Sequence, residues 1–188
     1  MMLLTTVSRA QEAVPDEGKG SAVRTFTVTL ADNSSKSINL PWQNRLTLLR
    51  IWKPGMEGNH RRHAQLRSIS ERYKKAWYKT ADGFEIVTLA VGNDRKQWKD
   101  LLTADSMSSF LNGQVMEPQN GAGFAGFQPD SYPYEVLMDE KGTVLAVNPD
   151  AKALEGLLAD RKIFQPAKRT LTGTLAQSLN RDEAFRNG

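Results

Sequence analysis

The chain has 188 residues, of which 39% are hydrophobic, so it can bury one substantial core and a single domain is expected. Its formal net charge of +4 is well short of the density of positive charge that favours nucleic-acid binding. The sequence contains no cysteine, which excludes a disulfide framework, a thiolate metal site and thiol–disulfide exchange by the isolated chain.

Residues 1–23 are expected to lie outside the folded domain. The apolar run at the start, MMLLTTV, is shorter than the core of a secretory signal and no basic residue precedes it, so it is interpreted as a partial signal segment. Residues 11–22 are polar and contain glycine and proline, which predicts a mobile leader. No run along the chain has the apolar length needed to cross a bilayer, so no membrane span is predicted.

Two alternating segments predict a β-hairpin at the start of the ordered chain, near Arg24. Phe26, Val28 and Leu30 alternate with threonines, which is typical of a half-buried strand. The turn cluster at 31–35 leads into a second alternating segment at 37–40.

The stretch from Leu46 to Tyr78 predicts a strand, a tight loop and a long basic helix. Residues 46–52 are mostly apolar, which suits a largely buried strand. From about His60, apolar residues recur at the spacing of one helical face, at Leu66, Ile69, Tyr73 and Trp77. The loop 56–59 is therefore expected at the carboxyl end of a strand, where open α/β sheets usually place their sites.

The rest of the chain predicts a mixed sheet with flanking helices. Residues 84–91 form a second apolar strand, and the right-handed crossover between the two strands makes the centre of the sheet parallel. Asn93-Asp94 is a candidate helix cap, and the aromatic stretch 104–131 is interpreted as a long lid or binding loop. Residues 134–147 predict a β-hairpin, and Asn148-Pro149-Asp150 are assigned as N-cap, N1 and N2 of the next helix. The tail 163–188 is weakly helical.

Two of these regions resemble the thioredoxin-like family of the TlpA type, whose members are thiol–disulfide oxidoreductases of the bacterial envelope. In that family a strand ending in Phe-Trp-Ala leads into Cys-x-x-Cys and then a helix. Setting Trp52 on the family's tryptophan places Met56 and Asn59 at the two cysteine positions, with Glu57 and Gly58 between them. The resemblance therefore supports the fold and argues against the family's usual activity.

The second matching region is a proline followed by a strand, Asp-x-x-Gly, a strand and a helix. Here the proline is Pro133 after Tyr132, and the resemblance implies a cis peptide bond that faces the former redox loop. The matches extend from Phe26 to about Leu158, so the expected fold is thioredoxin-like α/β over residues 24–162, with an N-terminal hairpin extension. The resemblance also implies a periplasmic or envelope location, with the cytoplasm as the alternative.

The basic start of the long helix contains the main candidate site residues. His60 and His63 can share one helical face, and with Glu57 they could hold zinc or copper, although the intervening arginines would repel a cation. The alternative is an anion or acidic-peptide site, because cations near a helix amino end are disfavoured unless something negative compensates them. The residues of that site are His60, Arg61, Arg62, His63 and Arg67. Solvation of the arginines, or pairing with Glu57 and Glu71, explains them equally well.

Other motifs have little support. Residues 121–126 match G-x-G-x-x-G, but no strand precedes them and no helix follows, so no nucleotide or other cofactor is predicted. No Gly-x-Ser-x-Gly elbow is present, and no catalytic residue is assigned.

The sequence favours a redox-inactive binding or scaffold module that engages a protein or peptide partner. Its site is expected between Met56–His63, the Tyr132-Pro133 turn and the loop from Phe124 to Phe127, where backbone beside the proline can accept an extended segment. Two alternatives stay open: an enzyme or metal carrier that uses His60, His63 and Glu57, and an oxidoreductase relative that acts with a partner's thiol. The oligomeric state is left open.

Overall fold

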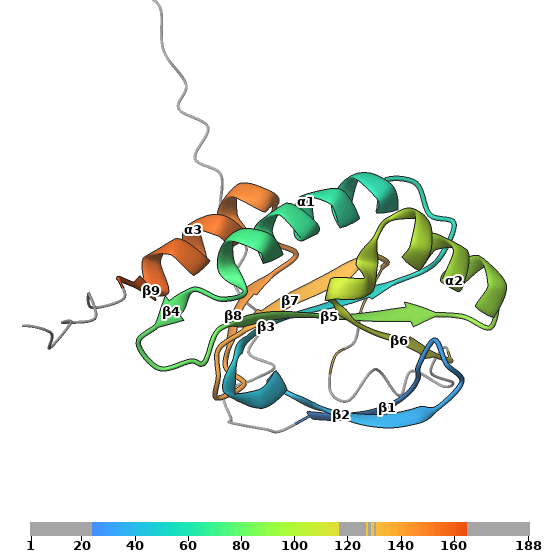
Figure 1. Ribbon diagram of the computed structural model, residues 1–188, viewed down its shortest axis with the longest axis horizontal. Coiled ribbons are helices and arrows are strands. Elements are labelled where there is room, and N and C mark those ends of the chain that lie inside the picture. The colour runs from blue at the N-terminus through green and yellow to red at the C-terminus, as the bar shows by residue number, and fades with distance from the viewer. Residues whose placement is uncertain (1–23, 117–126, 128, 130, 165–188) are drawn as a thin grey trace, which may run out of the picture.

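The computed structural model describes residues 24–116, 127, 129 and 131–164. Within them, the central element is a seven-stranded sheet with the order β2-β1-β6-β5-β3-β7-β8 (Figure 1). Its strands are β1 Arg24–Thr29, β2 Ser35–Leu40, β3 Leu46–Trp52, β5 Phe84–Val91, β6 Leu111–Val115, β7 Tyr134–Met138 and β8 Val144–Val147. Strands β3, β5 and β6 are parallel, and the remaining pairs are antiparallel. The predicted mixed sheet with a parallel centre is confirmed.

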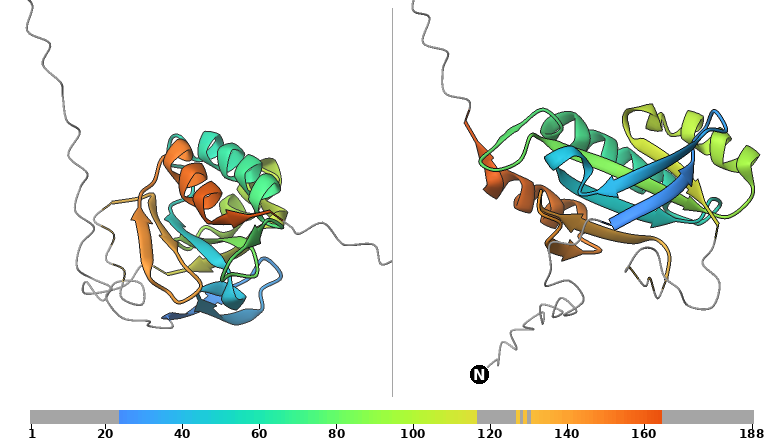
Figure 2. Two further views of the ribbon diagram at one scale, coloured as in Figure 1. Left: turned by 90° about the vertical axis from the view of Figure 1, so that its left-hand side faces the viewer. Right: turned by 90° about the horizontal axis from the view of Figure 1, so that it is seen from below.

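The described residues form three α-helices, which lie on one face of the sheet (Figures 1 and 2). They are α1 Asn59–Tyr73, α2 Arg95–Ala104 and α3 Ala151–Arg161. Two 3-10 turns, Trp42–Asn44 and Met107–Ser109, stand before β3 and β6. A separate two-stranded sheet joins β4 Trp77–Tyr78 to β9 Lys162–Ile163.

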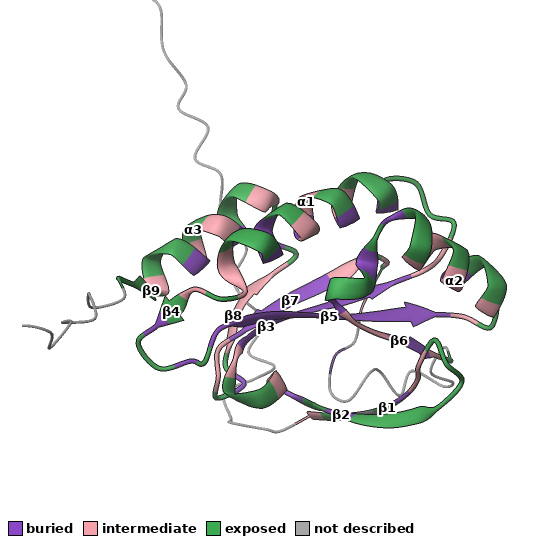
Figure 3. Cartoon of the chain, viewed as in Figure 1, coloured by how far each residue is buried: buried purple, intermediate pink, exposed green. Residues whose placement is uncertain are grey.

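The sheet separates two hydrophobic cores, and its central strands are buried throughout (Figure 3). The core under the helices contains buried residues of all three of them, namely Leu66, Ile69, Trp98, Leu154 and Leu158. The core on the opposite face is closed by the β1–β2 hairpin and Phe127, which bury Val28, Ile38 and Leu40 against the central strands. This arrangement explains why β3 and β5 are apolar on both faces.

The structure corrects three local predictions. Helix α1 ends at Tyr73 and does not reach Trp77, which belongs to β4. The stretch interpreted as a long loop, 104–131, contains β6 in the interior of the sheet. The N-cap of α3 is Asp150, whose carboxylate accepts a hydrogen bond from the Ala153 amide at 2.7 Å, and not Asn148.

Several predictions lie outside the described residues. They concern the leader 1–23, the glycine-rich stretch 121–126 with Phe124, and most of the tail 163–188. No helix of the described residues is long and apolar enough to cross a membrane.

Candidate functional site

The loop between β3 and α1 exposes the amino end of α1. Gly58 is the N-cap of α1 and has a φ of +82°, a left-handed conformation that favours glycine. The first turn of α1, which the structure describes completely, has no acidic residue and no side-chain cap. Within the first turn, no side chain compensates the partial positive charge of this helix end.

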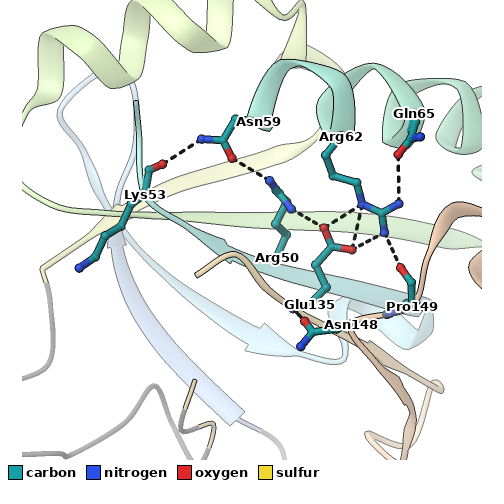
Figure 4. Close-up of polar contacts among 8 residues, drawn as sticks. All are labelled: Arg50, Lys53, Asn59, Arg62, Gln65, Glu135, Asn148 and Pro149. Atoms are coloured by element: carbon teal, nitrogen blue, oxygen red, sulfur yellow. Dashed lines mark hydrogen bonds and ion pairs between the residues drawn. The ribbon is translucent and has the colours of Figure 1, made fainter. Parts of the chain in front are cut away.

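The two positions assigned to redox cysteines by resemblance differ in their environment. Met56 is exposed, with 38% of its surface accessible, whereas Asn59 is buried. The side-chain nitrogen of Asn59, Nδ2, donates to the Lys53 carbonyl at 2.9 Å, and its side-chain oxygen accepts from Arg50 Nη2 at 2.9 Å (Figure 4). Asn59 thus ties the loop to the central strand.

Below this loop, Glu135 is held between two arginines (Figure 4). Arg50 and Glu135 are opposite each other in the register of β3 and β7, and Arg50 Nη1 donates to Glu135 Oε1. From α1, Arg62 Nε donates to both oxygens of Glu135, at 3.0 and 3.2 Å, and Arg62 Nη2 also donates to Oε2. All three ionic groups are therefore fixed by elements of the sheet and of α1.

Neighbouring groups complete this network. Arg62 Nη2 donates to the Pro149 carbonyl at 2.7 Å, and the Glu135 amide donates to Asn148 Oδ1 at 2.7 Å. Burial lowers the pKa of Arg50, and the charge and hydrogen bond of Glu135 oppose that shift. A buried guanidinium of this kind depends on its carboxylate partner.

The network forms the floor of an open pocket of about 280 Å³. The peptide bond between Tyr132 and Pro133 is cis, as the resemblance implies, and Pro133 lies at the wall of this pocket. The lining residues come from β3, β7, the loop, α1 and the segments before β7 and α3, and they are Arg50, Glu57, Gly58, Asn59, Arg62, Pro133, Glu135, Asn148 and Pro149. The ionic groups at the floor are Arg50, Arg62 and Glu135, and the exposed Glu57 adds a second carboxylate at the rim.

A second polar cluster ties α1 to the end of α2. His60 Nδ1 and His63 Nδ1 each lie 2.5 Å from one oxygen of Asp105, and Arg67 donates to the Asp105 carbonyl at 3.0 Å. The His60 side chain is 70% exposed and that of His63 is fully buried, with its ring edge-on to Trp52. Burial lowers the pKa of His63, which makes the neutral imidazole its favoured form.

Asp105 accepts from both imidazoles. Burial on its own raises the pKa of this carboxyl, but the hydrogen bonds from His63 and His60 outweigh burial and hold the pKa below its usual range. His63 Nε2 has no hydrogen-bond partner among the described residues, so a proton added there would be buried without an acceptor.

The structure does not support the metal site. That hypothesis requires both histidines to be accessible around a common point with Glu57, yet His63 is buried and both Nδ1 atoms face Asp105. Among the described residues, no group of three histidine, cysteine or acidic side chains could hold a metal ion. Glu57 instead lines the arginine pocket.

The predicted anion cluster is divided between two places. Arg62 enters the pocket, whereas His60, His63 and Arg67 contact Asp105, and Arg61 is exposed. The partner of Arg62 is Glu135, not Glu57 or Glu71. The amino end of α1 and Pro133 both line the pocket.

Three residues of these clusters were missed by sequence reasoning: Arg50, Glu135 and Asp105. Arg50 interrupts the apolar run LTLLRIW and Glu135 interrupts YEVLM, so each is a charge within a strand that is otherwise buried. Because buried charges are usually paired, two such interruptions on different strands were a usable signal. Asp105 follows the last residue of α2 and offered no comparable signal.

Comparisons with known proteins support the fold. No family model and no curated protein sequence matches the chain. A thiol-disulfide oxidoreductase from Bacteroides fragilis is 21% identical, with a TM-score of 0.57 over 73% of this chain and 97% of that one. A thiol:disulfide interchange protein from Bacteroides sp. is 16% identical, with a TM-score of 0.58 over 83% and 97%. A secreted disulfide oxidoreductase from Mycobacterium tuberculosis is 17% identical, with a TM-score of 0.54 over 72% and 95%.

These similarities cover most of the chain and nearly all of each of the three structures. At such identities they establish the fold and not the activity. The chain has a thioredoxin-like fold, similar to that of thiol-disulfide oxidoreductases, and it contains no cysteine with which to perform their redox chemistry.

Proposed function

We propose that the chain is a redox-inactive, thioredoxin-like binding module that engages an extended peptide carrying an acidic side chain. The observation that carries the proposal is the pocket between Gly58, Arg62 and Pro133, whose floor holds two arginines and one glutamate. The uncapped amino end of α1 adds partial positive charge at the same place.

The peptide would follow the surface beside Pro133, where backbone groups can pair with an extended chain. Its acidic side chain would enter the pocket and accept a hydrogen bond from Arg62 Nη1, whose contact with Gln65 Oε1 is long, at 3.4 Å. The other edge of this guanidinium, Nε and Nη2, is held by Glu135 and the Pro149 carbonyl. Glu57 also lines the pocket and is exposed, so its charge would compete with that of the ligand.

The proposed location is the periplasm or envelope. It is supported by the similarity of the fold to that of a protein described as a secreted disulfide oxidoreductase.

The test compares two blocked pentapeptides, Ala-Val-Glu-Val-Ala and Ala-Val-Gln-Val-Ala, by calorimetric titration and amide chemical shifts. The glutamate peptide should bind severalfold more tightly than the glutamine peptide, and the difference should shrink at high salt. Glu57→Lys should strengthen binding of the glutamate peptide, because it replaces a competing negative charge by a positive one. Arg62→Gln should weaken it.

The matched control is Arg72→Gln, which removes an arginine of the same helix that pairs with Glu155 away from the pocket. It should leave both affinities unchanged. Equal affinity for the two peptides, or binding that Glu57→Lys does not alter, would contradict an acidic ligand at this pocket.

A further inference from the structure

Large hydrophobic side chains gather at the small sheet formed by β4 and β9. Among the described residues, five such side chains are exposed, and three of them are Trp77, Ile163 and Phe164, with 53%, 39% and 94% of their surfaces accessible. Trp77 and Ile163 are opposite each other in the register, so their side chains lie on the same face of this sheet. Phe164 follows directly. We call these three residues the β4–β9 patch.

Basic residues surround the β4–β9 patch. A hollow of about 480 Å³ beside Trp77 is lined by Arg45, Lys74 and Lys75. Together with the exposed or half-buried residues of the flanking chain, the set comprises Arg45, Lys74, Lys75, Lys79, Arg161 and Lys162. The acidic residues of the same region are Glu71, which lines a second hollow with Lys74 and Lys75, Asp82, which lines the first, Glu85, which pairs with Lys74 at 3.2 Å, and Asp160. Six basic and four acidic residues leave a net charge of +2.

We infer that the β4–β9 patch is a membrane-docking surface that binds bilayers containing anionic lipid. Tryptophan, phenylalanine and isoleucine side chains can enter the boundary between head groups and acyl chains, while surrounding lysines attract the negative surface. Lysine is depleted where proteins bind other proteins, so a collar with four lysines fits a lipid surface better than a protein partner.

The position of the patch suits docking of this kind. Helix α1 has fifteen residues, a length of about 22 Å, with Asn59 and the arginine pocket at its start and the chain that leads to β4 after its end (Figure 1). Figure 3 shows exposed residues at the β9 end of the molecule. Docking through the β4–β9 patch would leave the pocket at the end of α1 that is far from the bilayer. The inference goes beyond the proposed function and does not depend on it.

The experiment is flotation of the full chain with vesicles of phosphatidylcholine that contain about one-third phosphatidylglycerol, compared with vesicles of phosphatidylcholine alone. The chain should float with the anionic vesicles, remain in solution with the neutral ones, and be released when salt shortens the range of the attraction. Trp77 fluorescence, isolated as the difference between the wild type and Trp77→Phe, should move to shorter wavelength on binding.

Two variants test the two halves of the surface. Trp77→Ser/Phe164→Ser and Lys75→Glu/Lys79→Glu should each weaken partitioning roughly tenfold or more. The matched control, Lys96→Glu/Lys152→Glu, changes the net charge equally at exposed positions on α2 and α3 and should leave partitioning nearly unchanged.

Other outcomes would overturn the inference. Binding to both vesicle types alike, or no binding to the anionic ones, would exclude charge-dependent docking. Trp77 emission already shielded from iodide before vesicles are added would show that another part of this chain covers the patch. A dimer in light scattering that Trp77→Ser/Phe164→Ser abolishes would assign the patch to self-association instead.

Discussion

Arg50 and Glu135 face each other across β3 and β7, and both side chains are buried at the floor of the pocket. Glu135→Gln would leave Arg50, and beside it Arg62, without their carboxylate. A buried charge that has lost its partner is strongly destabilising. We therefore expect this change to lower the free energy of unfolding by about 3–5 kcal/mol. Urea denaturation of the wild type and the variant measures the difference.

The double variant Arg50→Met/Glu135→Leu serves as its control. Removal of both charges leaves no unpaired group at Arg50, and only the partly exposed Arg62 loses its carboxylate. The loss should therefore be clearly smaller than the sum of the losses in Arg50→Met and Glu135→Leu alone. Additive losses would mean that the contact between the two residues contributes nothing beyond their separate burial.

His63 makes stability depend on pH in a defined direction. Burial holds its pKa in the folded state below the ordinary value of 6.5, so the unfolded chain binds the proton more readily. This contribution is complete above pH 6.5 and declines as the pH falls below that value, by up to about 1.4 kcal/mol per pH unit. Unfolding free energies measured between pH 5 and 7.5, for the wild type and His63→Gln, should show a steeper decline in the wild type.

Asp105 acts in a separate window. Its pKa in the folded state lies below the ordinary value of 3.8, so its contribution to stability is lost only when the pH falls through the region below that value.

For the His63 prediction, His60→Ala provides the control, since it removes the exposed imidazole and should retain the decline in stability near pH 6. A decline that is unchanged in His63→Gln would contradict the assignment to His63.

At the scale of elements, the sequence predicted the strands and helix caps whose residue pattern differs clearly from that of the neighbouring segments. The runs at β3 and β5 are apolar enough to indicate buried strands, and Asp94 caps α2 as expected, accepting from the Gln97 amide at 2.9 Å. β6 was missed because its sequence, LNGQV, is neither alternating nor apolar. Its place in the sheet comes from pairing with β5 and from Gly113, which admits Val28.

The end of α1 shows the same limit. Trp77 continues the helical spacing of apolar residues, yet the Lys74 carbonyl accepts from the Phe84 amide, a contact between the end of α1 and the start of β5. The apolar spacing therefore predicted a helix that is longer than α1, which tertiary contacts end at Tyr73. For the candidate site, the predicted topology indicated the carboxyl end of β3 and the start of α1. The ionic floor of the pocket depends on the register of β3 and β7, which the sequence alone did not reveal.

Two glycines provide opposite expectations for the same substitution. A Cβ on Gly113 would lie 2.7 Å from Val28 Cβ, so Gly113→Ala must displace the β1–β2 hairpin and should cost about 1–3 kcal/mol. Gly156 is in α3, where an added Cβ would meet no atom within 4 Å, so Gly156→Ala should add up to about 1 kcal/mol by favouring the helix. Urea midpoints of both variants test the pair, and destabilisation by Gly156→Ala would show that this face of α3 is covered.

For the whole molecule, the attachment of the β1–β2 hairpin predicts unequal local stability. β3 pairs with β5 along its full length and with β7 at five positions, whereas β1 joins β6 at one register position, Thr29 with Gln114. The hairpin is held mainly by its apolar side chains, which pack in the core on the face of the sheet opposite the helices; we call this the lower core. Elements with few ladder hydrogen bonds to the rest of a fold open without global unfolding.

We therefore expect amide hydrogen exchange to be slowest in β3 and β5 and faster in β1 and β2. Mass spectrometry of the exchanging chain would resolve these segments, and Gly113→Ala should accelerate exchange in β1 and β2 while leaving β3 and β5 close to their wild-type rates. If the hairpin instead exchanges at the same rate as the central strands, with the same dependence on denaturant, then it unfolds only with the whole domain. In that case the lower core, rather than the hydrogen bonds of the sheet, sets the cooperativity of the fold.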